Sequence, residues 1–163
     1  MLSAVALVLS FLESLIPTAA FMPPGAKAGF SNIATMFAAS SMGLIPALAI
    51  TVIKALFAGV TRGASAFFMS FAGGVLSTLT MFILFKFTKN SGYMLIGVLS
   101  AVMHNIGQLV VAAFIVGNKA VIGYAPILLI AGIITGAITG SIFRAVIPAL
   151  LKVENILIQK GGK

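Results

Sequence analysis

Long apolar runs are the feature that most constrains how this chain can fold. The segments 64–87, 93–116 and 127–151 are each long enough to cross a bilayer as a helix, which takes about 20 residues. Of the 163 residues, 61% are hydrophobic and 7% are charged, whereas about 25% of the residues in soluble domains are charged. The sequence therefore predicts an integral membrane protein.

Glycine, proline and charged residues divide the chain into six apolar segments. The three that precede the long runs cover residues 2–16, 31–41 and 47–60. The second of these is too short to cross a hydrocarbon core of about 30 Å unless it is tilted or shielded by neighbours. We expect an all-α fold, an integral membrane bundle of six transmembrane helices over residues 1–152, and a cytoplasmic C-terminal tail over residues 153–163.

The distribution of basic residues predicts the orientation. If the N-terminus is cytoplasmic, the bases of the inner regions outnumber those of the outer loops, as cytoplasmic loops of membrane proteins usually require. We therefore expect a multi-pass protein of the cell membrane with both termini in the cytoplasm. The net charge of +8 indicates attraction to anionic lipids of the bilayer, and we expect no nucleic-acid partner. The inner bases are Lys86, Lys89, Arg144, Lys152, Lys160 and Lys163, and the outer ones are Lys27, Arg62 and Lys119.

Four strongly polar residues lie near the middle of apolar segments. Lys54 lies in the middle of the third segment, and His104, Asn105 and Gln108 lie near the middle of the fifth. An ionisable residue at membrane depth costs about 2.5–3.5 kcal/mol on insertion scales, so it is a candidate functional group. His104 and Gln108 are one helical turn apart and share a face. They either bind a ligand or hydrogen-bond between helices.

The outer half of the predicted bundle carries an excess of positive charge. Lys27, Lys54 and Arg62 stand against Glu13 alone. If these bases face a cavity open to the outside, the cavity favours an anionic ligand that carries a carboxylate or a phosphate. The alternative is that Lys54 extends its amine toward the interface or pairs with Glu13.

Three glycines form a stripe in the last apolar run. Gly132, Gly136 and Gly140 follow one another at four-residue spacing, which places them on one face of a helix. Each glycine inside a helix costs about 1 kcal/mol, so a close helix contact must compensate for it. The stripe packs either against the chain's own bundle or against another subunit.

The composition argues against catalysis. The chain has no cysteine, no aspartate and a single histidine. It therefore lacks a thiol nucleophile, the usual ligand set of a zinc site, and the aspartate clusters that hold magnesium for prenyl or phosphoryl transfer. We expect no enzymatic activity, no cofactor and no bound metal. No GxxxxGK[ST] phosphate loop is present either.

Two stretches carry a resemblance to known membrane families. The stretch from Gly25 to Thr35 (GAKAGFSNIAT) resembles the loop and short second helix of two related groups. One is the Gx transporters, often labelled heptaprenyl diphosphate synthase component I, and the other is the S components of energy-coupling-factor vitamin transporters. The stretch from Gly97 to Gln108, with His104 and Asn105, is similar to a further signature of the Gx transporters.

This resemblance implies a six-helix bundle that captures a small molecule from outside. In S components, small residues at four-residue spacing on the first helix dock a transmembrane coupling subunit, and Ala6 and Ser10 have that spacing here. We therefore expect an S-component-like substrate-binding subunit for uptake of a small anionic molecule, powered by a separate coupling module with ATPases. The alternative is a non-transport accessory protein of isoprenoid or quinone metabolism or of extracellular electron transfer. The expected ligand-binding residues are Lys27, Asn32, Lys54, His104, Asn105 and Gln108.

Overall fold

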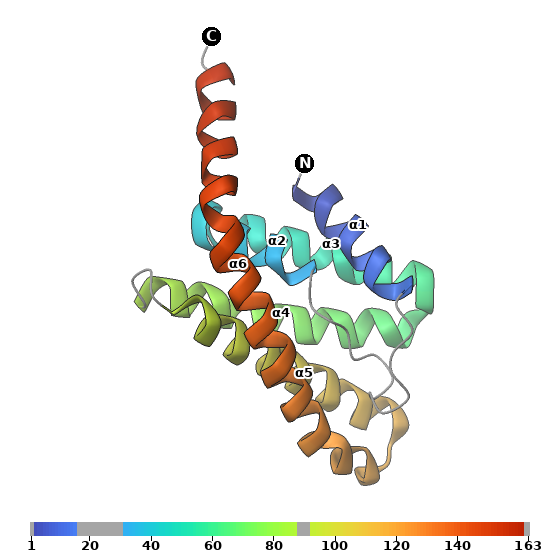
Figure 1. The fold of residues 1–163 in the computed structure, drawn as a ribbon. Helices are drawn as coiled ribbons and strands as arrows, with labels where there is room; N and C mark the ends of the chain where they lie inside the picture. The colour runs from blue at the N-terminus through green and yellow to red at the C-terminus, as the bar shows by residue number, and fades with distance from the viewer. Residues whose placement is uncertain (1, 16–30, 88–91, 162–163) are drawn as a thin grey trace.

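The regular elements of the structure are all helical. The structure is a computed structural model that describes residues 2–15, 31–87 and 92–161 (Figure 1). A π-helical turn η1 (Ala38–Met42) follows α2, and a 3₁₀ segment η2 (Lys119–Tyr124) precedes α6. The α-helices are α1 (Leu2–Leu15), α2 (Ser31–Phe37), α3 (Leu44–Arg62), α4 (Ala64–Phe87), α5 (Tyr93–Val116) and α6 (Ala125–Gly161).

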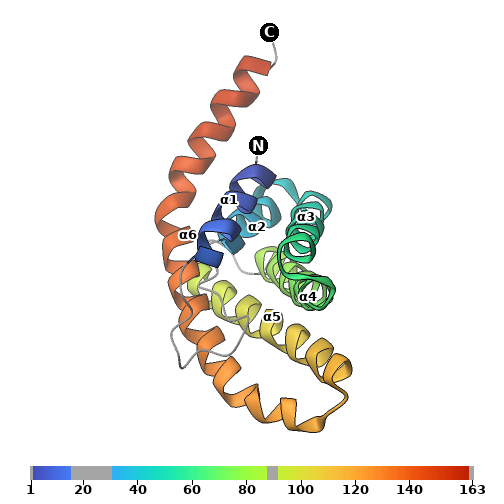
Figure 2. The ribbon, with the colours of Figure 1, turned by 90° about the vertical axis from the view of Figure 1, so that its right-hand side faces the viewer.

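The four long helices form a curved row in chain order. α3 packs on α4, α4 on α5, and α5 on α6, so each helix runs antiparallel to the one before it. α2 lies on the inner side of this row and contacts α1, α3, α4 and α6 (Figures 1 and 2). α1 packs on α2 and α3. The two short helices therefore close the side that the four long helices leave open.

Helix length and composition mark four candidate membrane spans. These are Leu44–Arg62, Ala64–Phe87, Tyr93–Val116 and Val121–Lys152. Their outer faces carry large apolar side chains, as lipid contact requires, and Ile45, Val60 and Phe114 are each more than 80% exposed (82%, 88% and 83%). The all-α prediction is confirmed. Of the six helices predicted to cross the membrane, α1 with 14 residues and α2 with 7 are shorter than the roughly 20 that a span takes.

Two glycines set the ends of α3. Gly43 and Gly63 both have φ of +94°, a conformation that L side chains rarely adopt, and Gly63 alone connects α3 to α4. The N–H of Gly43 donates a hydrogen bond to the carbonyl oxygen of Ala38 (2.9 Å), which closes the π-helical turn that precedes α3. The second predicted segment, 31–41, is thus α2 together with most of η1.

α6 is longer than the last predicted segment. It runs without interruption from Ala125 to Gly161, about 55 Å at 1.5 Å per residue, with Pro148 inside it. The predicted boundary at residue 152 therefore falls inside a helix, and the expected tail is helical as far as Gly161. α6 is bowed and projects beyond the other helices, and the start of α1 lies toward the same end of the molecule as the end of α6 (Figures 1 and 2).

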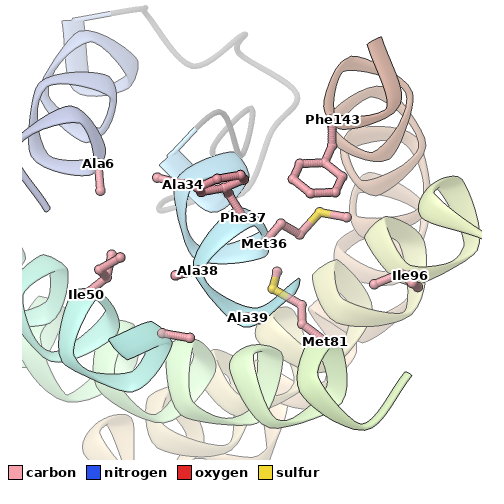
Figure 3. Close-up of a cluster of buried hydrophobic side chains, with 11 residues drawn as sticks. Ala6, Ala34, Met36, Phe37, Ala38, Ala39, Ile50, Met81, Ile96 and Phe143 are labelled. Carbon is pink, nitrogen blue, oxygen red and sulfur yellow. The ribbon is translucent and has the colours of Figure 1, made fainter. Parts of the chain in front are cut away.

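The apolar core surrounds α2 (Figure 3). Met36 and Phe143 are fully buried at 0% exposure, and Met81 and Ile96 at 2% and 1%. Phe143 of α6 packs edge-on against Tyr93, with ring centroids 5.3 Å apart. Because surrounding lipid is as apolar as these side chains, they stabilise the bundle by close packing rather than by leaving water. This core closes one end of the cavity described next.

Candidate ligand-binding cavity

A cavity of about 180 Å³ lies inside the bundle. All six α-helices contribute to its wall, and the residues from α3 and α4 include Arg62 and Ser65 beside the turn that joins them. It extends from the turn that joins α3 and α4 to Met81 near the end of α4 and Gly97 near the start of α5. The lining residues are Ser10, Ser31, Asn32, Met36, Lys54, Arg62, Ser65, Ala66, Met69, Ser70, Met81, Gly97, Ala101, His104, Asn105, Gln108, Thr135 and Thr139.

Lys54 connects α3 to α2 within this cavity. Its side chain is half-buried, and its Nζ donates a hydrogen bond to Oδ1 of Asn32 at 2.9 Å. Asn32 is at the start of α2, whose buried face fixes its position. The amide is neutral, so this hydrogen bond solvates the ammonium group without cancelling its charge.

Close helix contacts position the polar residues of α5. A methyl group added at Gly73 of α4 would lie 2.6 Å from the backbone oxygen of His104 and 2.9 Å from Cγ of Gln108. At Gly107 of α5, the same addition would lie 2.8 Å from Cα of Gly73. Only glycine lets the two backbones approach so closely. The contact brings His104 and Gln108 to the wall that α4 shares with α5.

Asn105 ties α5 to α6. Its Nδ2 donates a hydrogen bond to the backbone oxygen of Leu128 at 2.7 Å. Gly132 leaves the space for this side chain, because an added Cβ there would lie 2.9 Å from Nδ2. The amide nitrogen of Asn105 thus forms a hydrogen bond between α5 and α6, and Asn105 also lines the cavity.

The charged side chains among the described residues that line the cavity are basic. Lys54 and Arg62 both line it, and no carboxylate side chain is among the described lining residues. The whole chain has two acidic residues, Glu13 and Glu154. A cavity with fixed cations and hydrogen-bonding groups attracts and orients an anion. Where the structure describes the chain, no group of three or more histidine, cysteine or acidic residues is placed to hold a metal ion.

A second, inner chamber of about 10 Å³ adjoins this cavity. Asn32, Lys54, Ser70 and His104 line both spaces and separate them. The inner chamber is otherwise lined by Thr35, Thr51, Gly74, Ser77 and Thr78.

The structure brings five of the six expected ligand residues to one cavity. They are Asn32, Lys54, His104, Asn105 and Gln108, while Lys27 lies outside the described residues. The expected set omitted the serines and methionines of α4. Their signal is the recurrence of small, polar and methionine residues along α4, at 66, 69, 70, 73, 74, 77, 78 and 81. This three- and four-residue spacing marks the interior face of a helix in lipid.

The predicted docking face on α1 lies inside the bundle. Ala6 is fully buried at 0% exposure within the apolar core, and Ser10, at 6%, lines the cavity. Small residues at four-residue spacing permit a close contact, but here the contact is with the chain's own helices. These two residues therefore offer no exposed surface to a coupling subunit in this structure.

The glycine stripe of α6 faces α5. A methyl group added at Gly136 would lie 2.6 Å from Cα of Val98. One added at Gly140 would lie 2.7 Å from Cα of Met94. A methyl group added at Gly132 would meet Asn105 and Val102, which are also on α5. All three glycines are buried in the bundle. The glycine stripe therefore packs against the chain's own bundle, which is the first of the two predicted alternatives.

These features define a class of protein: a multi-pass membrane protein with a polar, positively charged cavity between its helices. The chain matches the family described as heptaprenyl diphosphate synthase component I over residues 2–146, which is most of its length. It therefore belongs to the heptaprenyl diphosphate synthase component I family. The chain matches none of the curated proteins or solved structures with which it was compared.

Proposed function

We propose that this protein is a membrane-embedded substrate-binding subunit for the uptake of a small anionic molecule, similar in role to S components. The observation that carries the proposal is the cavity of about 180 Å³, lined by Lys54 and Arg62. Polar and charged groups inside a bundle surrounded by lipid are costly and are characteristic of substrate pathways. An engineered cavity of about 150 Å³ holds benzene, so the size suits a small molecule.

Energy for uptake would come from a separate coupling module with ATPases. This chain carries no GxxxxGK[ST] phosphate loop that could bind a nucleotide. Because Ala6 and Ser10 are buried, a coupling subunit would contact a different surface of the bundle. We propose binding rather than catalysis, since the chain has neither aspartate nor cysteine with which to build a reactive centre.

A second candidate role is that of an accessory protein. The description of the family, component I of a heptaprenyl diphosphate synthase, favours a non-transport role in isoprenoid or quinone metabolism. In that role the polar residues of the cavity would hold the helices together and would bind no ligand. Native mass spectrometry of gently purified protein separates the two roles, because only a binding subunit is expected to retain a small molecule.

The test compares the wild type with Lys54→Met. Lys54 lines the cavity, and removal of its charge should leave the fold intact or stabilise it, because a cation is expensive at membrane depth. The retained small molecule should be lost. Lys86→Met is the matched control, because Lys86 is exposed in the last turn of α4 and should not affect retention. A variant at Lys54 that misfolds while the ligand is still retained would make Lys54 a structural residue and overturn the proposal.

A further inference from the structure

Two buried hydroxyl groups line the inner chamber. The side chains of Thr35 on α2 and Ser77 on α4 are each 3% exposed. Neither Thr35 Oγ1 nor Ser77 Oγ has a hydrogen-bond partner among the described residues. A polar group in that position costs folding free energy, and most such groups in proteins are satisfied. Two of them beside one chamber therefore point to an occupant that accepts their hydrogen bonds.

Two other hydroxyls of the chamber, those of Thr51 and Thr78, already have hydrogen-bond partners. Thr51 Oγ1 donates to the backbone oxygen of Ala47 (3.0 Å), and it lies 2.7 Å from Oγ1 of Thr78. Since the proton of Thr51 is engaged with Ala47, Thr78 is the donor in the contact between the two threonines. Of the buried hydroxyls, those of Thr35 and Ser77 thus remain as donors toward the chamber, next to the ammonium of Lys54.

The size of the chamber limits its occupant to a single atom. A space of about 10 Å³ is close to the smallest that admits one water-sized atom. The donors around it include two buried hydroxyls and an ammonium group, which fit an oxygen that carries negative charge. A carboxylate is flat and can insert one of its two oxygens into such a small space. The three terminal oxygens of a phosphate surround a bulkier centre, which makes insertion of one oxygen harder. One lysine also matches the single charge of a carboxylate.

We propose that the inner chamber receives one oxygen of a carboxylate group, whose remaining chain lies in the main cavity. This inference rests on the proposed function and adds the substrate class, a small carboxylic acid. Thr35 and Ser77 donate to the inserted oxygen, and Lys54 balances its charge at the boundary of the two spaces. Asn32, His104 and Ser70, which also line that boundary, surround the second carboxylate oxygen.

Thr35→Val and Ser77→Ala test the assignment. The probes are butyrate, its neutral isostere butyramide and inorganic phosphate, measured by equilibrium dialysis on protein in lipid nanodiscs. Wild type should bind butyrate more tightly than either other probe. Each variant should weaken butyrate binding about tenfold, the effect of losing one hydrogen bond to a charged group. The melting temperature should stay unchanged or rise, because neither hydroxyl has a partner among the described residues.

Thr78→Val is the matched control. Its hydroxyl borders the same chamber, but it is bonded to Thr51 in the protein itself. Its loss should lower the melting temperature and change butyrate affinity less than the other two substitutions.

Four outcomes contradict the account at different levels. Wild-type affinity for butyrate in Thr35→Val and Ser77→Ala would overturn the inference and leave the proposed function standing. A fall in melting temperature with unchanged affinity would mean that the chamber holds only a structural water. If wild type binds phosphate more tightly than butyrate, and the same substitutions weaken phosphate binding, the ligand class is a phosphate and the carboxylate assignment is wrong. If wild type binds none of the probes and retains no small molecule, the proposed function itself fails.

Discussion

At the scale of single residues, the pair formed by Lys54 and Asn32 is the informative feature. Asn32 accepts a hydrogen bond from Nζ of Lys54 at 2.9 Å, and neither residue is fully buried. Both residues line the cavity, so an anion that enters it would meet the ammonium group of Lys54 and the amide group of Asn32.

Asn32→Asp should therefore abolish anion binding without loss of the fold. The new carboxylate would pair with Lys54 and occupy the charge that the ligand needs, so butyrate affinity should fall at least tenfold in equilibrium dialysis. The melting temperature should be equal to or above that of the wild type. Asn32→Leu is the control that removes the hydrogen bond but adds no charge, and its affinity should fall less. Wild-type affinity in Asn32→Asp would show that Lys54 is not the anion's partner.

The polar residues of the site could be predicted to different extents. Lys54, His104 and Gln108 could be recognised because strongly polar side chains stand out in apolar runs. Thr35 and Ser77 could not, because most hydroxyls in membrane helices bond to their own backbone, as Thr135 and Thr139 do here. Which hydroxyl lacks that bond depends on the exact packing of neighbouring helices.

At the scale of elements, two sets of glycine contacts fix the position of α5. Gly107 contacts Gly73 of α4, and Gly97 contacts Gly136 and Gly140 of α6. The cavity-lining residues Ala101, His104 and Asn105 lie between these two contacts along α5. The glycines therefore hold the helix that carries most of the polar wall, although only Gly97 lines the cavity itself.

Gly136→Ala should destabilise the isolated bundle. The added methyl group would lie 2.5 Å from the backbone oxygen of Gly97, so α5 and α6 must separate. Overpacking of this kind costs typically about 1–3 kcal/mol, which should appear as a lower midpoint in thermal unfolding. Gly123→Ala is the control, because an added methyl group there meets nothing within 4 Å. Equal midpoints for the two variants would mean that α5 and α6 are not in close contact.

Helix boundaries could be predicted well where glycine or charge interrupts an apolar run. The predicted segments 64–87 and 93–116 have the limits of α4 and α5, because Gly63 and Gly117 adopt conformations with positive φ at their ends. The end of α6 could not be predicted, since the helix continues past Pro148 and beyond the apolar run. The small-residue face of Ala6 and Ser10 was recognisable as a contact, but spacing alone does not identify the neighbouring helix.

At the scale of the whole molecule, the first and last helices indicate how the bundle is oriented. The start of α1 and the end of α6 are at the same end in Figures 1 and 2. The basic residues predict that this side is cytoplasmic. Lys86, which is exposed at the end of α4, then lies inside, and Asn118, which is exposed after α5, lies outside.

Cysteine labelling of intact cells tests this orientation, because the chain has no native cysteine. Asn118→Cys should react with a membrane-impermeant maleimide added from outside. Lys86→Cys should react only after the membrane is permeabilised. Label at position 86 from outside, with none at position 118, would reverse the orientation.

The most direct measurement of the central claim is an experimental structure of the protein in lipid nanodiscs, purified without added ligand or in the presence of butyrate. The account predicts non-protein density in the cavity, within about 3.5 Å of Nζ of Lys54 and extending toward Thr35 and Ser77. A cavity closed by protein side chains, with the carboxylate of Glu13 bonded to Lys54, would contradict it.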